Sequence, residues 1–288
     1  MRRIDWHRGM GVAPAITASE RPRSAMEFGF EVFALLALAA FVAGTIDALA
    51  GGGGLITIPA LMAAGIPPVQ AIATNKLQSS FGTTSAVLAF ARQGRIDFRR
   101  FLWPAVGAFA GSVGGAIAIQ LVDPSFLAGL VPVLLVAMAS YFLLGPKASE
   151  AERHARLGQA ALVTIMFALG FYDGFFGPGT GSFMATMLVA LFGFGLVSAT
   201  AHTKLLNLSS NIAALATLVI GGQVLWTVGL VMAVASIAGG QLGAHLALGK
   251  AGARLIRPLL VVMSLALTAK LLMEPGNPLV GWVRGLVG

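Results

Sequence analysis

The amino-acid sequence predicts an all-α protein that crosses a membrane many times and is built from two homologous repeats. Three observations predict this: an apolar composition, long unbroken apolar runs, and a pattern of polar residues and glycines that occurs twice. Of the 288 residues, 57% are hydrophobic and 10% are charged, whereas soluble domains are about 25% charged. Such a chain needs lipid as its solvent, and lipid admits only helices or closed barrels. Because the apolar runs are long and do not alternate, we expect helices.

Ten apolar segments follow one another, and we expect each to form a helical element. They cover residues 28–49, 55–66, 69–90, 101–121, 126–144, 157–176, 181–193, 197–219, 224–247 and 256–272. Most are long enough for a hydrocarbon core of about 30 Å. The second and the seventh are too short to span it comfortably, and each follows a glycine-rich break.

The segments divide the chain into five parts. We expect a polar tail over residues 1–27, a first transmembrane repeat over 28–145, a cytoplasmic linker over 146–156, a second repeat over 157–273 and a C-terminal tail over 274–288. The N-terminal tail lacks the apolar core and cleavage site of a signal peptide. Two interpretations stay open: a disordered tail, or a start codon assigned too early, because Met26 directly precedes the first apolar segment.

A duplication is indicated by residues that recur at a constant spacing. One group recurs 126 residues later: Gly44, Asp47, Gly51 and Gly53 match Gly170, Asp173, Gly177 and Gly179. A second group recurs 128 residues later: Ala73, Lys76, Leu77, Gly94, Gly111 and Gly115 match Ala201, Lys204, Leu205, Gly222, Gly239 and Gly243. Matched Asp and Lys residues inside apolar segments rarely arise by chance, so we interpret the pattern as an internal duplication.

Loop charges favour repeats of inverted orientation. Three loops are cationic (92–100, 145–156 and 249–257), and two carry no positive charge (122–124 and 221–225). Five crossings per repeat place all three cationic loops in the cytoplasm, as the positive-inside rule requires, and invert the second repeat. Four crossings per repeat, with the short element only re-entering, would make the repeats parallel and place the loop over 249–257 outside. The number of spans, ten or eight, therefore stays open.

The glycine-rich breaks cover residues 50–54 and 176–181. Broken helices in inverted repeats are typical of secondary transporters. Each break opens a short helix, whose first N–H groups are unpaired and lie at the positive end of the helix dipole. Two such helix starts predict an anion site, with backbone donors at Gly52, Gly53, Gly54, Gly179, Thr180 and Gly181. Close helix packing is the alternative explanation for the glycines.

Lys76 and Lys204 lie well inside apolar segments, where a cation costs about 2.5–3.5 kcal/mol. We therefore expect both to face an interior cavity and to bind substrate. Hydroxyl, amide and ammonium groups can replace the hydration shell of a small oxyanion, and polar neighbours of both lysines are further candidates: Thr74, Asn75, Gln78, His202, Thr203 and Asn207.

The alternative is that each lysine forms a structural pair with the aspartate of its own repeat, Asp47 or Asp173. These two aspartates end the first helix of each repeat. They could neutralise the lysines of an empty site, carry a coupling proton, or cap the short helix that follows.

Several other classes of function are disfavoured. The chain has no cysteine and four histidines, so we expect no disulfide, no thiol chemistry, no metal site and no cofactor. Common hydrolase, metalloprotease and ATPase motifs are absent; Ser182 and His202 could suggest a membrane hydrolase, but Ser182 is more simply a helix start. We therefore expect no enzyme. The net charge of +8 comes with arginines in short loops, so it indicates membrane orientation and not nucleic-acid binding.

The break motifs resemble the sulfite exporter TauE/SafE family of bacterial membrane permeases. The first motif runs over residues 44–61 and continues at 73–78, and the second runs over 170–181 and continues at 201–207. The similarity covers about residues 28–273 and leaves out the N-terminal tail. It implies a multi-pass carrier in the bacterial inner membrane for sulfite, organosulfonates such as sulfoacetate, or other small anions, with export as the implied direction.

The sequence therefore predicts a secondary transporter of small anions, with sulfur oxyanions as the expected substrates. Its expected partners are the lipid bilayer and the anion, and the oligomeric state, including a homodimer, is left open. A passive anion or solute channel and an accessory membrane protein without flux are the alternatives. A metal or cation permease is disfavoured by the two intramembrane lysines.

Overall fold

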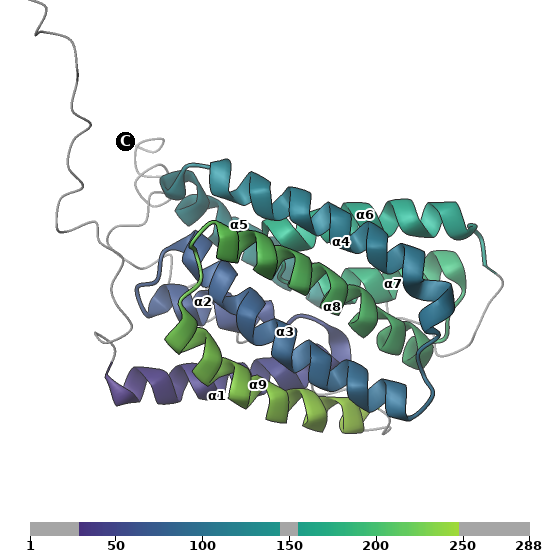
Figure 1. Ribbon diagram of the computed structural model, residues 1–288, viewed down its shortest axis with the longest axis horizontal. Helices are drawn as coiled ribbons and strands as arrows, with labels where there is room; N and C mark the ends of the chain where they lie inside the picture. Colours follow the sequence, from purple (N-terminus) through teal and green to yellow (C-terminus); the bar gives the residue numbers. More distant parts are fainter. Residues whose placement is uncertain (1–28, 145–154, 248–288) are drawn as a thin grey trace, which may run out of the picture.

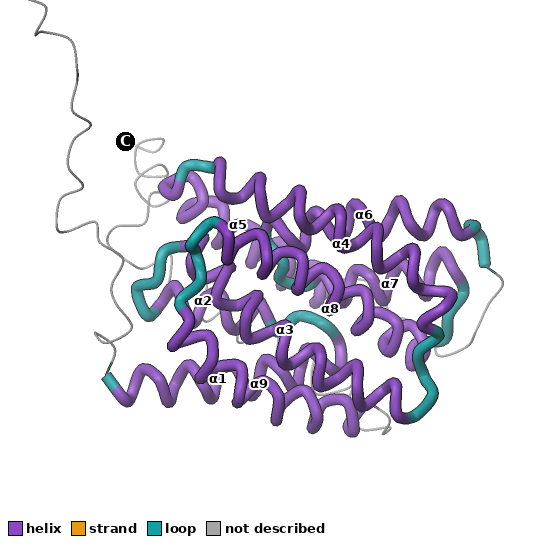
Figure 2. Tube along the Cα trace, viewed as in Figure 1, coloured by secondary structure: helices purple, strands orange, loops and turns teal. Residues whose placement is uncertain are grey.

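The computed structural model describes residues 29–144 and 155–247, and the regular structure in these ranges is entirely α-helical (Figure 2). In chain order the helices are α1 (Phe30–Ala50), α2 (Gly54–Ala63), α3 (Pro68–Arg92), α4 (Phe98–Leu121), α5 (Pro124–Leu144), α6 (Gln159–Phe175), α7 (Thr180–Phe192), α8 (Leu196–Ile220) and α9 (Trp226–Ala247). This confirms the predicted helical fold. The tenth predicted segment, most of the linker and both tails lie outside the described residues.

Four of the described helices are long and apolar enough to cross a membrane: α1, α4, α8 and α9. Helices α3 and α8 are equally long, with 25 residues each. Helix α3 is less apolar, because a run of polar side chains surrounds Lys76. Helices α2 and α7 have only 10 and 13 residues, and at 1.5 Å per residue neither is long enough to span a bilayer core. The chain is therefore a multi-pass helical membrane protein with two short helices inside the bundle.

The helices lie side by side, with α3 and α8 in the middle of the bundle (Figure 1). Helix α1 packs on α9 along one edge, and α4 packs on α6 along the other. Helix α3 also contacts α9, α8 contacts α4, and α3 and α8 contact each other. If α1–α4 are exchanged with α6–α9 in order, the α1–α9 and α4–α6 pairs interchange, the α3–α9 and α4–α8 pairs interchange, and the α3–α8 pair maps onto itself. The duplication itself stays a prediction.

Glycines bring the two outer helix pairs into backbone contact. On α9, a Cβ at Gly239 or Gly243 would collide with the carbonyl oxygens of Phe41 and Thr45 on α1. On α4, a Cβ at Gly111 or Gly115 would collide with the α6 carbonyl oxygens of Phe167 and Phe171. Small residues four apart allow this approach in membrane helices, where packing drives association. The glycines therefore explain why α1 lies on α9 and α4 on α6.

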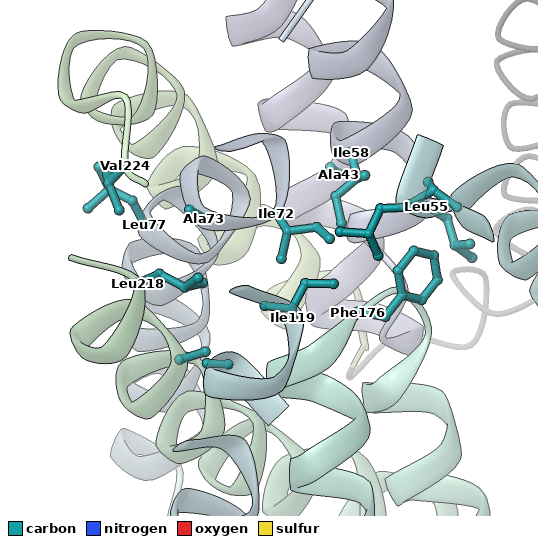
Figure 3. Close-up of a cluster of buried hydrophobic side chains, with 14 of the residues drawn as sticks. Ala43, Leu55, Ile58, Ile72, Ala73, Leu77, Ile119, Phe176, Leu218 and Val224 are labelled. Carbon is teal, nitrogen blue, oxygen red and sulfur yellow. The ribbon is translucent and has the colours of Figure 1, made fainter. Parts of the chain in front are cut away.

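Two apolar clusters lie at opposite ends of α4 and α8. The first, shown in Figure 3, joins Ile119 of α4 and Leu218 of α8 to side chains of α2 and α3, among them Leu55 and Ile72. The second joins the other ends of the same helices, at residues 101–108 and 199–206, to α6 and α7. Buried polar residues of α8, namely Asn207, Ser210 and Asn211, lie between the clusters along the helix. The polar centre of the molecule is thus flanked by packed apolar side chains.

Candidate functional site

The two glycine-rich breaks meet at the centre of the bundle. The hydroxyl of Ser182 donates to the carbonyl oxygens of Ala50 and Gly51. A Cβ at Gly51 would lie 2.6 Å from the carbonyl carbon of Gly181, so only glycine permits this approach. Gly51, with φ at +72°, also adopts a left-handed conformation, which glycine adopts without strain. The starts of α2 and α7 therefore lie next to each other.

Lys76 of α3 lies beside these helix starts and is almost completely buried. Its Nζ is 2.9 Å from Oδ2 of Asp173, at the end of α6, with side-chain exposures of 1% and 2%. The same Nζ donates to Oδ1 of Asn211 at 3.0 Å. Asp173 also accepts a hydrogen bond from the hydroxyl of Ser210 at 2.6 Å. Both charges of this buried pair therefore have a charged partner and a hydrogen bond, the condition under which buried charges are tolerated.

Lys204 of α8 forms the other ion pair, with Asp47 at the end of α1. Its Nζ is 3.3 Å from Oδ2 of Asp47 and also donates to the backbone carbonyl of that residue. Oδ1 of Asp47 accepts from the backbone N–H groups of Gly52 at 3.1 Å and Gly53 at 3.4 Å. Asp47 therefore caps the first break and pairs with a lysine at the same time.

The partners of the ion pairs differ from the sequence-based alternative. That alternative paired each lysine with the aspartate of its own predicted repeat, and it is wrong: Lys76 pairs with Asp173 and Lys204 with Asp47. The reason is the meeting of the two breaks, which brings the end of α6 to α3 and the end of α1 to α8. Each lysine thus reaches across the molecule.

A small polar cavity of about 20 Å³ lies between the ion pairs. A water molecule needs about 10–15 Å³ by the same measure, so the cavity has room for about one water-sized group. Ten of the residues predicted from the sequence line it: Asp47, Gly52, Gly54, Asn75, Lys76, Asp173, Gly179, Thr180, Gly181 and Asn207. Both breaks, α3 and α8 therefore contribute to one site.

Of the other predicted residues, Lys204 lies close to this cavity without lining it, two line another pocket, and Thr203 lines neither. Lys204 Nζ lies 3.7 Å from where a Cβ of Gly181 would be. Gly53 and Gln78 line a second pocket on another side of Asp47. The hydroxyl of Thr203 is buried and has no hydrogen-bond partner among the described residues.

Thr74 and His202 face away from the cavity and fix loops instead. The Thr74 hydroxyl accepts the backbone N–H of Leu225 at 3.2 Å, and Nε2 of His202 accepts the backbone N–H of Asp97 at 3.0 Å. The His202 ring also stacks on Phe101, with ring centroids 4.0 Å apart. Both residues precede a lysine by two positions, which turns them about 200° around the helix. No Ser182–His202 pair forms, because each side chain bonds elsewhere.

Asn211 lines the cavity but was not among the residues predicted from the sequence; Ser79 and Gly177, near predicted residues, line it too. Helical spacing would have found two of them. Asn211 follows Lys204 by seven positions and Asn207 by four, and Ser79 follows Lys76 by three. Residues three, four and seven apart share one helix face, so a lysine that faces a cavity predicts polar residues at these positions.

Comparison with known proteins identifies similar chains. The family described as sulfite exporter TauE/SafE matches residues 36–271. A probable membrane transporter protein, ORF9, of a Sinorhizobium species is 46% identical over 258 residues, covering 89% of this chain and 98% of that protein. The probable membrane transporter protein YfcA of Escherichia coli K12 is 44% identical over 251 residues, covering 86% and 93%. No solved structure matches the chain.

Proposed function

The chain belongs to the sulfite exporter TauE/SafE family of membrane transporters, and from this premise we propose that it carries small anions across the bacterial inner membrane. Sulfite, an organosulfonate or a related sulfur oxyanion is the proposed substrate, and export is the proposed direction. The family and the names of the relatives indicate a membrane transporter and not an enzyme.

One observation carries the proposal: two buried lysines lie where two helix starts meet. The partners of these lysines support an anion as the ligand. The carboxylate of Asp47 accepts N–H groups of the first break and lies 3.3 Å from the ammonium of Lys204. An oxyanion in its place would meet the same donors and the same charge. The carboxylate of Asp47 therefore acts as an internal substitute for the substrate.

The size of the cavity indicates that at least one ion pair must open before an anion can bind. A space of about 20 Å³ does not hold a sulfur atom with three oxygens, since it accommodates about one water. Binding would require that a lysine turn from its carboxylate to the anion. Removing one partner of a buried pair without compensation costs about 3–5 kcal/mol, so the anion must supply the missing charge.

Transport by alternating access follows from the same arrangement. Secondary transporters built from inverted repeats bind substrate at broken helices near the bilayer midplane and open the site to one side at a time. We propose that the duplicated halves of this chain are such repeats. The two crossed ion pairs would close the empty site, and the anion would replace one of them during each cycle.

The test is anion flux in liposomes that contain the purified protein. We expect Lys76→Gln and Lys204→Gln each to reduce saturable sulfite or sulfonate flux by about 10–150-fold, because a hydrogen bond to a charged group contributes about 1.5–3 kcal/mol. Arg95→Gln is the matched control, since it removes an exposed cation from the α3–α4 loop. Parent-like flux in both lysine variants would reject the site.

The same measurements separate the alternatives. A passive channel would give flux that rises linearly with anion concentration and does not respond to a proton or cation gradient. An accessory protein without flux would show no transport in liposomes, and the lysine substitutions would lower only its abundance.

A further inference from the structure

A second small pocket lies on another side of Asp47, between α1, α3 and α9. Its volume is about 10 Å³, close to the space that one water-sized group needs. The polar side chains that line it are those of Asp47, Gln78, Ser79, Thr83 and Ser236. The other lining residues are small, so backbone atoms also lie close to the space.

Two buried oxygens beside this pocket have no partner. Gln78 Oε1 and Thr83 Oγ1 make no hydrogen bond among the described residues, and both residues are 2% exposed. The orientation of the Gln78 amide is fixed, because its Nε2 donates to Asn75 Oδ1 at 3.0 Å and to Ser79 Oγ at 2.9 Å. Buried polar atoms are normally hydrogen bonded, so the two oxygens require a small polar group in the pocket, either a water molecule or a cation.

The chemistry of the lining selects the ligand. All of the side-chain groups offer oxygen: one carboxylate, one amide oxygen and three hydroxyls. Hard cations prefer oxygen ligands, whereas transition metals prefer nitrogen or sulfur. Within residues 29–144 and 155–247, no group of three or more His, Cys, Asp or Glu side chains gathers, which argues against a divalent metal. A single carboxylate matches a single positive charge.

We propose that this pocket binds a sodium ion, which replaces Lys204 as the partner of Asp47 when an anion binds. Sodium in transporters is coordinated by side-chain oxygens, unwound backbone carbonyls and helix ends beside a broken helix, and this pocket lies beside the break at Gly53. The proposal rests on the proposed function, because it is the anion that takes the ammonium of Lys204 away from Asp47.

Asp47 couples the two ligands because it lines both pockets. In the empty protein its charge is balanced by Lys204. An anion bound to Lys204 leaves the carboxylate unbalanced, and sodium restores neutrality. By linkage, each ligand then raises the affinity for the other by the same factor. Sodium would travel with the anion, so export would occur where the outward anion gradient exceeds the inward sodium gradient.

The positions equivalent to this pocket in the other half of the molecule lack two of its oxygen donors. The positions that match Gln78 and Ser236 at the 128-residue spacing are Leu206 and Ala108. Both are buried in the apolar cluster between α4, α6, α7 and α8. The structure therefore predicts one sodium site, beside Asp47, and none beside Asp173.

Thermal unfolding of the purified protein in detergent tests the site without any anion substrate. We expect sodium chloride to raise the melting temperature by about 2–4 °C relative to choline chloride at equal ionic strength. Gln78→Leu and Thr83→Val should abolish this shift. Thr84→Val is the matched control, since its hydroxyl bonds only to the carbonyl of Ser80 on its own helix and it does not line the pocket. Lys204→Gln should enlarge the shift, because Asp47 then lacks its competing ammonium.

Two outcomes would overturn the proposal. Equal melting temperatures in sodium and choline for both the parent and Lys204→Gln would show that the pocket holds no sodium, as a resident water would. A sodium shift that persists in Gln78→Leu and Thr83→Val would place the ion elsewhere. Neither outcome affects the lysine-dependent anion flux, so failure of the sodium site and failure of the anion site are distinguishable.

Discussion

Asp47 and Asp173 end corresponding helices, α1 and α6, yet their surroundings differ. Asp173 is 2% exposed and lies 2.9 Å from its lysine, and the hydroxyl of Ser210 supports the same oxygen. Asp47 is 23% exposed and lies 3.3 Å from its lysine, and its second oxygen binds backbone N–H groups of the first break. Asp173 is more deeply buried and borders one cavity, whereas Asp47 borders two.

The difference indicates that the two ion pairs have different roles. The pair of Lys76 and Asp173 is almost completely buried and borders one cavity, so it would be costly to open, and we infer that it anchors the two halves to each other. The pair of Lys204 and Asp47 is longer and borders space on two sides. We infer that this pair opens when ligands bind. Substitutions that act unequally on the two pairs test this comparison.

The largest expected effect is on the enclosed pair. Asp173→Ala should lower the free energy of unfolding by about 3–5 kcal/mol, because it leaves the Lys76 ammonium buried without a carboxylate. Asp47→Ala should cost clearly less, since the ammonium of Lys204 retains the backbone carbonyl of residue 47 and space for water. Chemical or thermal unfolding in detergent measures both variants. Equal losses of unfolding free energy in the two variants would contradict different roles for the two ion pairs.

A smaller effect is expected for the hydroxyl that supports Asp173. Ser210→Ala should cost about 1.5–3 kcal/mol, because the lost hydrogen bond goes to a charged group. Ser209→Ala is the neighbouring control: its hydroxyl donates to the neutral carbonyl of Ala105 at 2.8 Å, a bond worth about 0.5–1.5 kcal/mol. The same unfolding measurements compare the two. If Ser210→Ala cost no more than Ser209→Ala, Asp173 would not depend on this support.

The smallest expected effect concerns a residue outside the site. Thr74→Val removes the acceptor for the N–H of Leu225 and should cost about 0.5–1.5 kcal/mol, with no change in the apparent affinity for the anion in liposome flux. A raised half-saturation concentration would show instead that Thr74 contacts the substrate, as the sequence had suggested.

Local features of this fold could be predicted from the sequence. The apolar segment 181–193 became α7 over residues 180–192, and segment 69–90 became α3 over 68–92. These limits are set locally, by glycines and prolines beside apolar runs. The breaks and the buried lysines were also recognisable, because both are unusual inside apolar segments.

Features that depend on packing could not be predicted. Which aspartate each lysine reaches depends on how the ends of α1 and α6 meet α3 and α8, and no sequence spacing encodes this. Thr74 and His202 point away from the cavity because of their angular positions around α3 and α8. Choosing the polar residues nearest to each lysine in the sequence does not take these angles into account. Inverted orientation stays a prediction, since the loop over residues 249–257 that favours it lies outside the described part of the chain.

The backbone contacts between α1 and α9 and between α4 and α6 bear on how the molecule moves. Helices that touch through glycines have no layer of side chains between them that could rearrange, so each pair should move as one rigid body. Each rigid body combines a helix from before residue 145 with one from after residue 154. The parts that move relative to each other would then be these two helix pairs and not the two repeats, with Asp47 on one pair and Asp173 on the other.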